Sequence, residues 1–301
     1  MDTPITTSTR VPAGAPTLFS RTIKGARWLK RHPVILSGLL LLGMMVLIAV
    51  ASPWFATHDP VHLNPIERLK PPSAEHWFGT DQLGRDVYSR VIYGTQISLT
   101  VGFSVALLST IFGLAIGLVT GFVRSVDAIV MRIMDGLMAI PSILLAIALI
   151  SLSKSSVENV IIAITIPEIP RMVRLVRGVV LTLREQLFVD AAVSLGASVP
   201  RILFHHIMPN TVAPLIVQAT YVCASAIIIE AILSFLGAGT PPDIPSWGNI
   251  MAEGRTYVMI SFWILLAPGI FLTLVVLGVN LLGDGLRDTL DPRLRRSTGS
   301  L

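Results

Sequence analysis

The sequence contains little of what a soluble enzyme needs. Its 301 residues include a single cysteine, Cys223, so no intrachain disulfide can form, and no Cys/His spacing typical of a metal site is present. Charged residues make up 14% of the chain, against about 25% in soluble domains. There is no GxxxxGK[ST] phosphate loop and no HExxH or Ser/His/Asp constellation. These absences argue against ATP hydrolysis by this chain and against a membrane enzyme.

Hydrophobic residues, by contrast, make up 52% of the sequence, and the mean hydropathy is +0.73. The apolar runs are long enough to cross a bilayer, which predicts an all-α integral membrane protein. We expect six spans, at residues 34–55, 97–123, 134–152, 157–173, 211–236 and 259–283. The third is interrupted by "AIPS" and the fourth is broken by "PEIP". Broken helices at membrane depth must be buried in protein or line a cavity.

The first apolar run ends in Ala49-Val50-Ala51, which resembles a signal-peptide cleavage site. However, a polar leader of 33 residues and a run of about 22 apolar residues favour a retained transmembrane helix. We therefore expect residues 1–33 to form a cytoplasmic tail. Residues 1–20 are rich in Thr, Pro and Ala, which is typical of disordered chain.

Lysine and arginine are distributed unequally between the two sets of loops. Of the 23 basic residues, 17 lie in the leader, between spans two and three, after span four and in the C-terminal tail. The other six lie on the opposite side of the predicted membrane. Basic residues favour the cytoplasmic side, so both termini and the segment 185–209 are expected in the cytoplasm. The long loop at 56–96 is then external.

Two of these loops contain predicted helices. In the external loop, "GRDVYSRVIY" (84–93) has Val87, Val91 and Ile92 on one helical face, which predicts a short amphipathic helix at the membrane interface. A solvated loop helix is the alternative. In the cytoplasmic loop, residues 185–209 predict two short helices joined by a tight elbow.

The elbow is predicted by residues that typically end or begin helices. Gly196 can end the first helix in a left-handed conformation, and Ser198 can cap the second, with Pro200 in its first turn. Pro209 is expected to end the second helix. Leu187, Ala191 and Leu195 share one face, and the elbow itself is made of small residues. From the residues alone, a docking site and a re-entry hairpin without a partner are equally good interpretations.

The stretch "DAAVSLGASVPRILFHHIMPN" resembles the cytoplasmic EAA loop of ATP-binding-cassette (ABC) importer permeases. Asp190, Ala191, Ala192, Gly196 and Pro209 stand at the matching places. The chain departs from the pattern with Asp for Glu, and with His206 and Met208 for Ile and Leu. "HIMPN" is similar to the form found in the dipeptide/oligopeptide/nickel branch. Three further stretches, at 76–99, 233–255 and 280–295, also resemble that branch and its second, C-type permease. The resemblance covers about residues 30–296.

This resemblance implies a type I ABC importer permease fold with six transmembrane helices, a permease core at 97–283 and a cytoplasmic tail at 284–301. It implies a pore-forming subunit that moves di- or oligopeptides inward across a bacterial inner membrane. Nickel, glutathione, an opine, a sugar or another small solute is the alternative substrate. The implied partners are a related B-type permease, two cytoplasmic ATPase subunits, an external solute-binding protein and the lipid bilayer, with no nucleic acid. ATP and Mg would be bound by the ATPase subunits, and no cofactor or metal is expected in this chain.

The same resemblance assigns coupling to the ATPase to residues of the EAA loop: Asp190, Ala191, Ala192, Gly196, Ala197, Ser198, Arg201, His206 and Pro209. His205 and His206 are adjacent on a helix and point about 100° apart, so they make a poor joint metal site.

Few charges lie deep in the predicted spans, which argues against a stand-alone channel or a proton-coupled carrier. Glu230 lies 19 residues after Thr211, or about 28 Å along a helix, which predicts an interfacial position near the outer face. If it faces the pore, Glu230 could belong to an outer gate or meet a peptide ammonium group. Glu168 is expected to form a local ion pair with Arg171.

The charge distribution generates a test of topology. A cysteine introduced at Ser73 should react with a thiol reagent applied from outside the cell, and one introduced at Ser198 should be spared. Labelling of intact cells followed by mass measurement of the protein provides the readout. The reverse pattern would invert the predicted orientation.

Overall fold

A computed structural model describes residues 32–290, and these residues form helices joined by short loops and one long one, with an isolated bridge between Thr80 and Asp86. The expected disorder of residues 1–20 lies outside the described residues. The elements are α2 (Pro33–Val50), α3 (Ser52–Phe55), the 3₁₀ turn η1 (Pro65–Glu67), α4 (Val87–Phe122), α5 (Arg124–Ala139), α6 (Ser142–Ser151), α7 (Val157–Leu183), α8 (Leu187–Ser194), α9 (Val199–Ile202), the π-helical turn η2 (Leu203–Ile207), α10 (Met208–Phe235), α11 (Trp247–Gly254), the 3₁₀ turn η3 (Arg255–Tyr257) and α12 (Trp263–Leu290).

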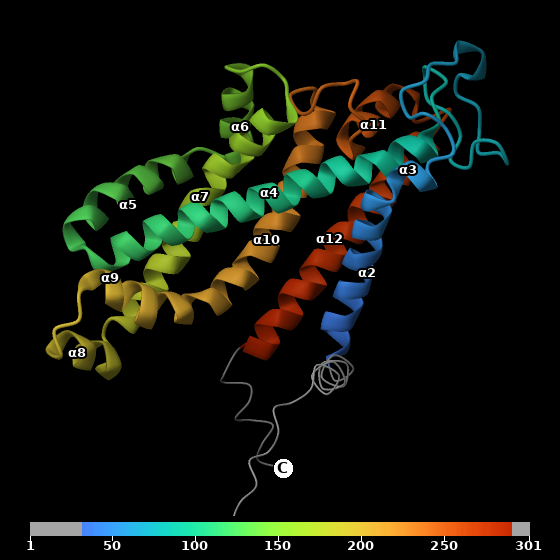
Figure 1. Ribbon diagram of the computed structural model, residues 1–301. Helices are drawn as coiled ribbons and strands as arrows, with labels where there is room; N and C mark the ends of the chain where they lie inside the picture. Colours follow the sequence, from blue (N-terminus) through green and yellow to red (C-terminus); the bar gives the residue numbers. More distant parts are fainter. Residues whose placement is uncertain (1–31, 291–301) are drawn as a thin grey trace, which may run out of the picture.

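The longest helix, α4, crosses the whole molecule (Figure 1). Its 36 residues correspond to about 54 Å at 1.5 Å per residue. It packs along α7 and α10, while α2 packs along α12 beside it. The long loop 56–86 gathers at the first end of α4, and α8 and α9 lie at the other end (Figure 1). The two loops predicted on opposite sides of the membrane are therefore at opposite ends of the fold.

Four helical segments within residues 32–290 are long and apolar enough to span a membrane: Pro33–Val50, Val87–Phe122, Val199–Phe235 and Trp263–Leu290. The α5–α6 pair adds a fifth if it is one broken span, and its two helices meet at an angle of 90° around the predicted "AIPS" interruption. The remaining predicted span, 157–173, falls in the first part of α7. The charged residues of α7 make this helix less apolar than the four spanning segments, so it is not counted among them.

The contact between α4 and α7 is made through glycines spaced one helical turn apart. A Cβ atom added to Gly117 would lie 2.6 Å from Cβ of Val176, and one added to Gly121 would lie 2.5 Å from Cβ of Val180. Gly113 similarly meets Met172. Without a hydrophobic driving force between helices in lipid, small residues let backbones approach closely enough for van der Waals attraction to hold them. At these glycines, the side chains of α7 therefore pack directly against the backbone of α4.

The expectation that "PEIP" breaks the fourth span is wrong, because α7 continues through both Pro167 and Pro170 over 27 residues. Each proline removes one backbone hydrogen bond from the helix. Close packing of the next turns of α7 against the glycines of α4 holds those turns in helical conformation. Tertiary contacts here outweigh the local preference of proline.

The predicted interfacial helix at 84–93 is also wrong, because α4 begins at Val87 and continues without interruption into the span. The side chain of Asp86 caps it by accepting a hydrogen bond from the backbone N–H of Ser89 at 2.8 Å. Val87 and Val91 are buried as expected, but Ser89 and Arg90 are buried as well. Folding of the loop 56–86 over this turn explains why its polar face is not exposed to solvent.

The glycine contacts predict that substitution by alanine changes the stability of the subunit differently at two sites. Gly117→Ala should lower the stability of the subunit by about 1–3 kcal/mol, because the added methyl group overpacks the contact with Val176. Gly178→Ala, on α7, should be neutral or stabilising, since no atom lies within 4 Å of its added Cβ and alanine favours helix. Thermal unfolding of the two purified variants provides the comparison. Equal effects would rule out a tight α4–α7 contact.

Candidate functional site

The segment 185–209 forms the expected elbow between two short helices. α8 ends in a Schellman motif: the N–H of Gly196 donates to the carbonyl of Val193 at 2.9 Å, and that of Ala197 donates to Ala192 at 3.0 Å. Gly196 has a φ of 77°, which is the left-handed conformation that glycine adopts without a Cβ penalty. The predicted role of Gly196 as a helix terminator is confirmed.

The second half of the elbow differs from the expectation. Ser198 occupies the N-cap position of α9, but its side chain makes no capping hydrogen bond, and Pro200 lies in the first turn as predicted. Pro209 does not end the helix. Residues Leu203–Ile207 form a π-helical turn that leads directly into α10, with the N–H of Met208 bonded to the carbonyl of Leu203. This wider turn changes the hydrogen-bond register just before Pro209, whose missing N–H then falls in the first turn of α10.

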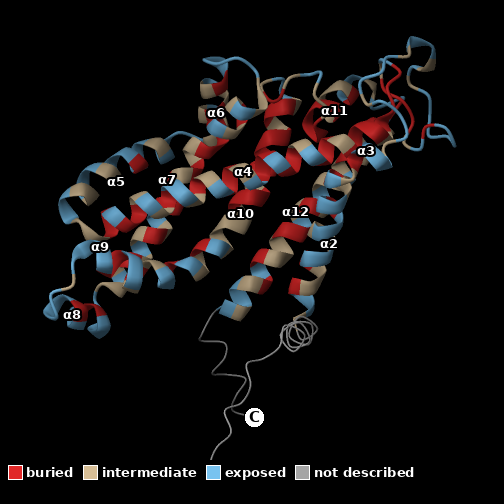
Figure 2. Ribbon diagram, in the orientation of Figure 1, coloured by how far each residue is buried: buried red, intermediate tan, exposed pale blue. Residues whose placement is uncertain are grey.

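One side of the elbow is packed and the other is exposed. Val189 and Ala192 are buried against the core, whereas Leu187 is 85% exposed and Leu195 is 88% exposed (Figure 2). The predicted coupling residues divide in the same way. Asp190, Ala191, Gly196, Ser198, Arg201 and Pro209 are exposed, Ala197 and His206 are half-buried, and Ala192 is buried. Exposed apolar side chains on an otherwise mostly exposed, small-residue elbow are candidates for a docking site.

Two sequence features of the spans have different outcomes. Glu168 and Arg171 form the expected ion pair, with Nη1 of Arg171 3.1 Å from the carboxylate. Glu230 is fully buried in the protein, five residues before α10 ends at Phe235, and its depth near the outer face stays a prediction. It accepts hydrogen bonds from the hydroxyl groups of Ser234 at 2.9 Å and Ser98 at 3.3 Å. Hydroxyl groups from α4 and from its own helix therefore satisfy this buried carboxyl group.

A buried network of charges joins the loop 56–86 to two helices at the first end of α4. Nη1 of Arg90 lies 2.6 Å from the carboxylate of Glu253 on α11 and also contacts Asp81 in the loop. Nε of Arg85 donates to Asp81 at 2.7 Å, and Arg85 also bonds Glu253. Two cations and two anions thus offset one another, as buried charges require. Loop, α4 and α11 are held together as one unit.

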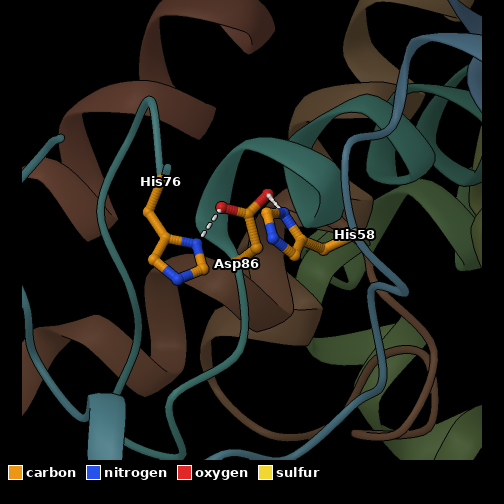
Figure 3. Close-up of side chains that lie close together, drawn as sticks. All are labelled: His58, His76 and Asp86. Atoms are coloured by element: carbon orange, nitrogen blue, oxygen red, sulfur yellow. Dashed lines mark hydrogen bonds and ion pairs between the residues drawn. The ribbon is translucent and has the colours of Figure 1, made fainter. Parts of the chain in front are cut away.

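A second cluster in the same loop is centred on His76 (Figure 3). Nδ1 of His76 lies 2.9 Å from the carboxylate of Asp86, and Nε2 lies 3.1 Å from that of Glu67. His58 approaches Asp86 from the other side at 3.9 Å (Figure 3). A neutral imidazole can donate from only one nitrogen, so satisfying both carboxylates requires the charged ring. Burial lowers the pKa of His76, but its hydrogen bonds to Asp86 and Glu67 outweigh burial and raise it above the ordinary 6.5.

The residues that could hold a metal ion overlap with this cluster. Among residues 32–290, two groups place their ligand atoms within 4.8 Å of one another: His58, His76 and Asp86, and Glu67, Glu75 and His76. Both groups use His76, whose two nitrogens already face carboxylates of the protein. The chemistry that the arrangement supports directly is retention of a proton on His76. Sequence reasoning missed this cluster because its members lie within one loop without a regular spacing, and they come together only when the loop folds.

Comparison with known proteins identifies two matching family descriptions. "Binding-protein-dependent transport system inner membrane component" matches residues 91–296, and "N-terminal TM domain of oligopeptide transport permease C" matches residues 24–72. Together they extend over most of the chain, from the end of the leader to beyond α12.

Among similar curated proteins, a probable peptide ABC transporter permease of Sinorhizobium fredii is 50% identical over 284 residues, which is 94% of this chain and 97% of that protein. A dipeptide transport system permease of Alkalihalophilus pseudofirmus is 44% identical, with 89% and 88% of the two chains covered. Among solved structures, an inward-facing MetNI methionine ABC transporter matches with a TM-score of 0.54 at 19% identity, covering 67% of this chain and 96% of that one. This last likeness concerns the fold alone.

The His76 cluster generates a prediction for pH dependence. Because the pKa of His76 is higher in the folded protein than in the unfolded chain, its stabilisation is fully present below about pH 6.5 and is lost as the pH rises through the folded pKa. Proteolysis within residues 56–86 should therefore accelerate as the pH rises through the folded pKa of His76. His76→Gln should remove this dependence, whereas His62→Gln, at an exposed position of the same loop, should retain it. An identical pH profile for wild type and His76→Gln would contradict the assignment.

Proposed function

This chain belongs to the family of binding-protein-dependent transport system inner membrane components, and on that basis we propose that it forms one half of the pore of an ATP-driven peptide importer. The resemblance to ABC importer permeases expected from the EAA loop and its accompanying motifs is confirmed. The chain is a transport subunit, and ATP hydrolysis takes place on separate ATPase subunits of the complex. Partner ATPase and binding-protein components follow from family membership.

The observation that carries the mechanism is the exposed elbow at 185–209. Its buried face, including Val189, fixes α8 to the body of the subunit, while Leu187 and Leu195 extend into solvent. An exposed apolar face gains free energy when a partner covers it, by about 25 cal/mol per Å² of apolar surface removed from water. We propose that this face docks on an ATPase subunit. Because the elbow continues through η2 into α10, a displacement of the elbow is transmitted directly to a span.

Peptides are the substrate class that the relatives support. The similar proteins from Sinorhizobium, Alkalihalophilus and Pseudomonas aeruginosa are named as peptide, dipeptide and di/tripeptide permeases, respectively. Their identities of 41–50% extend over at least 87% of this chain. We therefore favour di- or oligopeptides over nickel, glutathione, an opine or a sugar.

The remaining arrangement of the complex follows from the same proposal. A related B-type permease would complete the pore, and an external solute-binding protein would deliver peptide to the end that contains loop 56–86. The loop and the elbow lie at opposite ends of α4, which supports their location on opposite sides of the membrane (Figure 1). The excess of arginine around the elbow supports a cytoplasmic location for it and for both termini. ATP and Mg belong to the ATPase subunits, and this chain is proposed to bind no cofactor.

Gly196→Asp tests the coupling role of the elbow. An added Cβ meets no atom within 4 Å, and both Asp and Asn tolerate the left-handed conformation, so the variant should fold. The carboxylate would enter the docked interface without a partner, where an unpaired charge is costly. In a reconstituted complex, we expect ATPase-subunit retention to weaken about tenfold, which corresponds to about 1.4 kcal/mol, with a matching loss of peptide transport.

Gly196→Asn is the matched control, because it has the same shape without the charge and should be affected much less. Asp190→Glu should also be mild. Normal ATPase retention and normal transport by Gly196→Asp would show that this elbow is not the coupling element. Absence of peptide transport by the wild-type complex, with ATPase retention intact, would instead reject the substrate class.

A further inference from the structure

Two cavities lie on opposite sides of α10, and they differ in chemistry. One, of about 310 Å³, is lined by apolar side chains of α2, α4 and α12 and by Ile216, Ala219 and Cys223 of α10. The other, of about 420 Å³, is lined by Val217, Gln218 and Tyr221 of α10 together with Arg287 of α12. We call the cavity with Cys223 the apolar cavity and the cavity with Tyr221 and Arg287 the polar cavity.

Helical geometry separates the two cavities. Successive residues of an α-helix are rotated by about 100° around its axis. Around the axis of α10, the mean direction of the residues that line the polar cavity differs by about 200° from that of the residues that line the apolar cavity. Glu230 follows Tyr221 by nine residues, or about 900°, which places it half a turn from the polar cavity. This geometry explains why Glu230 is buried in the protein core and does not line the polar cavity.

The polar cavity is lined by one cation, Arg287, and by the hydroxyl-bearing side chain of Tyr221, which links it to a carboxylate outside the lining. The hydroxyl of Tyr221 donates to the carboxylate of Asp284 on α12, and Arg287 lies one turn further along the same helix. Asp284 and Arg287 are both exposed in the isolated subunit. Both residues follow the last predicted span (259–283), so the polar cavity lies at the end of the spans that the charge distribution predicts to be cytoplasmic. The apolar cavity, which contains no charged group, is compatible with lipid or with another apolar surface.

We propose that the polar cavity is a substrate-binding part of the translocation path, where Arg287 receives the carboxylate end of a short peptide. Asp284, which is bonded to the lining residue Tyr221, then receives the ammonium end beside the cavity. A carboxylate matches the donor fork of a guanidinium group, and an ammonium group matches a carboxylate. The volume lies within the range of about 300–1,000 Å³ typical of small-molecule sites. Tyr221 keeps Asp284 oriented while the site is empty. This inference rests on the proposed peptide substrate and assigns residues to its path.

Thiol accessibility in the complete transporter tests the path. The native cysteine is first removed as Cys223→Ala, and Val217→Cys is compared with Ala219→Cys, because both positions are half-buried on the same helix but face different cavities. A charged, membrane-impermeant thiol reagent applied to inverted membrane vesicles should modify Val217→Cys at least about tenfold faster, since reaction requires a solvated thiolate. Equal rates, or faster reaction at Ala219→Cys, would overturn the path.

Peptide protection tests the ligand. A dipeptide with free termini should slow modification of Val217→Cys, and the same dipeptide with acetylated and amidated ends should not. Arg287→Gln should raise the half-saturating concentration of the free dipeptide about tenfold and abolish the preference for a free over an amidated C-terminus. Arg287→Lys, which keeps a point charge without the fork, should restore part of that preference. A merely structural Arg287 would impair both peptides equally.

These outcomes separate the inference from the proposed function. If the wild-type complex transports the dipeptide but the dipeptide does not protect Val217→Cys, the binding assignment fails while the importer function stands. If no dipeptide is transported, the peptide proposal and the ligand assignment both fail. The ratio of labelling rates at the two positions still decides whether the polar cavity is a water-filled path.

Discussion

The close contact between α4 and α7 is the constraint on which the rest of the structure depends. Gly113, Gly117 and Gly121 leave no space between the two helices, and α4 extends from the loop 56–86 at one end of the fold to the elbow at the other (Figure 1). With lipid on the outside, the hydrophobic effect cannot drive the helices together, so this shape complementarity has to supply the attraction. It also fixes the position of α7, whose two prolines weaken its internal hydrogen bonding.

At the first end of α4, buried charges extend this rigid unit to the surface. Arg90 on the helix bonds Asp81 in the loop and Glu253 on α11, and Asp86 links the helix start to His76. Removing one member would leave an uncompensated charge, which typically costs about 3–5 kcal/mol. A protein docking on the loop would therefore push on α4 and α11 together. At the other end, the elbow continues into α10, so both predicted docking surfaces connect to spans without a flexible linker.

Different faces of α10 contact different parts of the subunit. One face carries Glu230 and packs on α4 through serine hydroxyl groups. Another presents Gln218 and Tyr221 to the polar cavity, opposite Arg287 of α12. In a membrane, a helix with only apolar faces would have little preference for one rotation, whereas these polar groups fix the rotation of α10 relative to α4 and α12. The wide π-helical turn before α10 sets that rotation relative to the elbow.

The sequence by itself determined the membrane class, the approximate positions of the spans, the elbow at Gly196 and, through its motifs, the family. These features depend on composition, apolar run length and the local conformational preference of glycine, all of which act within a few residues. Tertiary structure alone decided that α7 passes through "PEIP", that α4 begins at Val87 and that Pro209 continues a helix. In each case packing or a changed hydrogen-bond register outweighs a local preference. It also decided the environment of Glu230 and the assembly of His76, Asp86 and Glu67, and of Tyr221 with Asp284. The first group lies in an irregular loop and the second on two different helices, so only the folded backbone brings their members together.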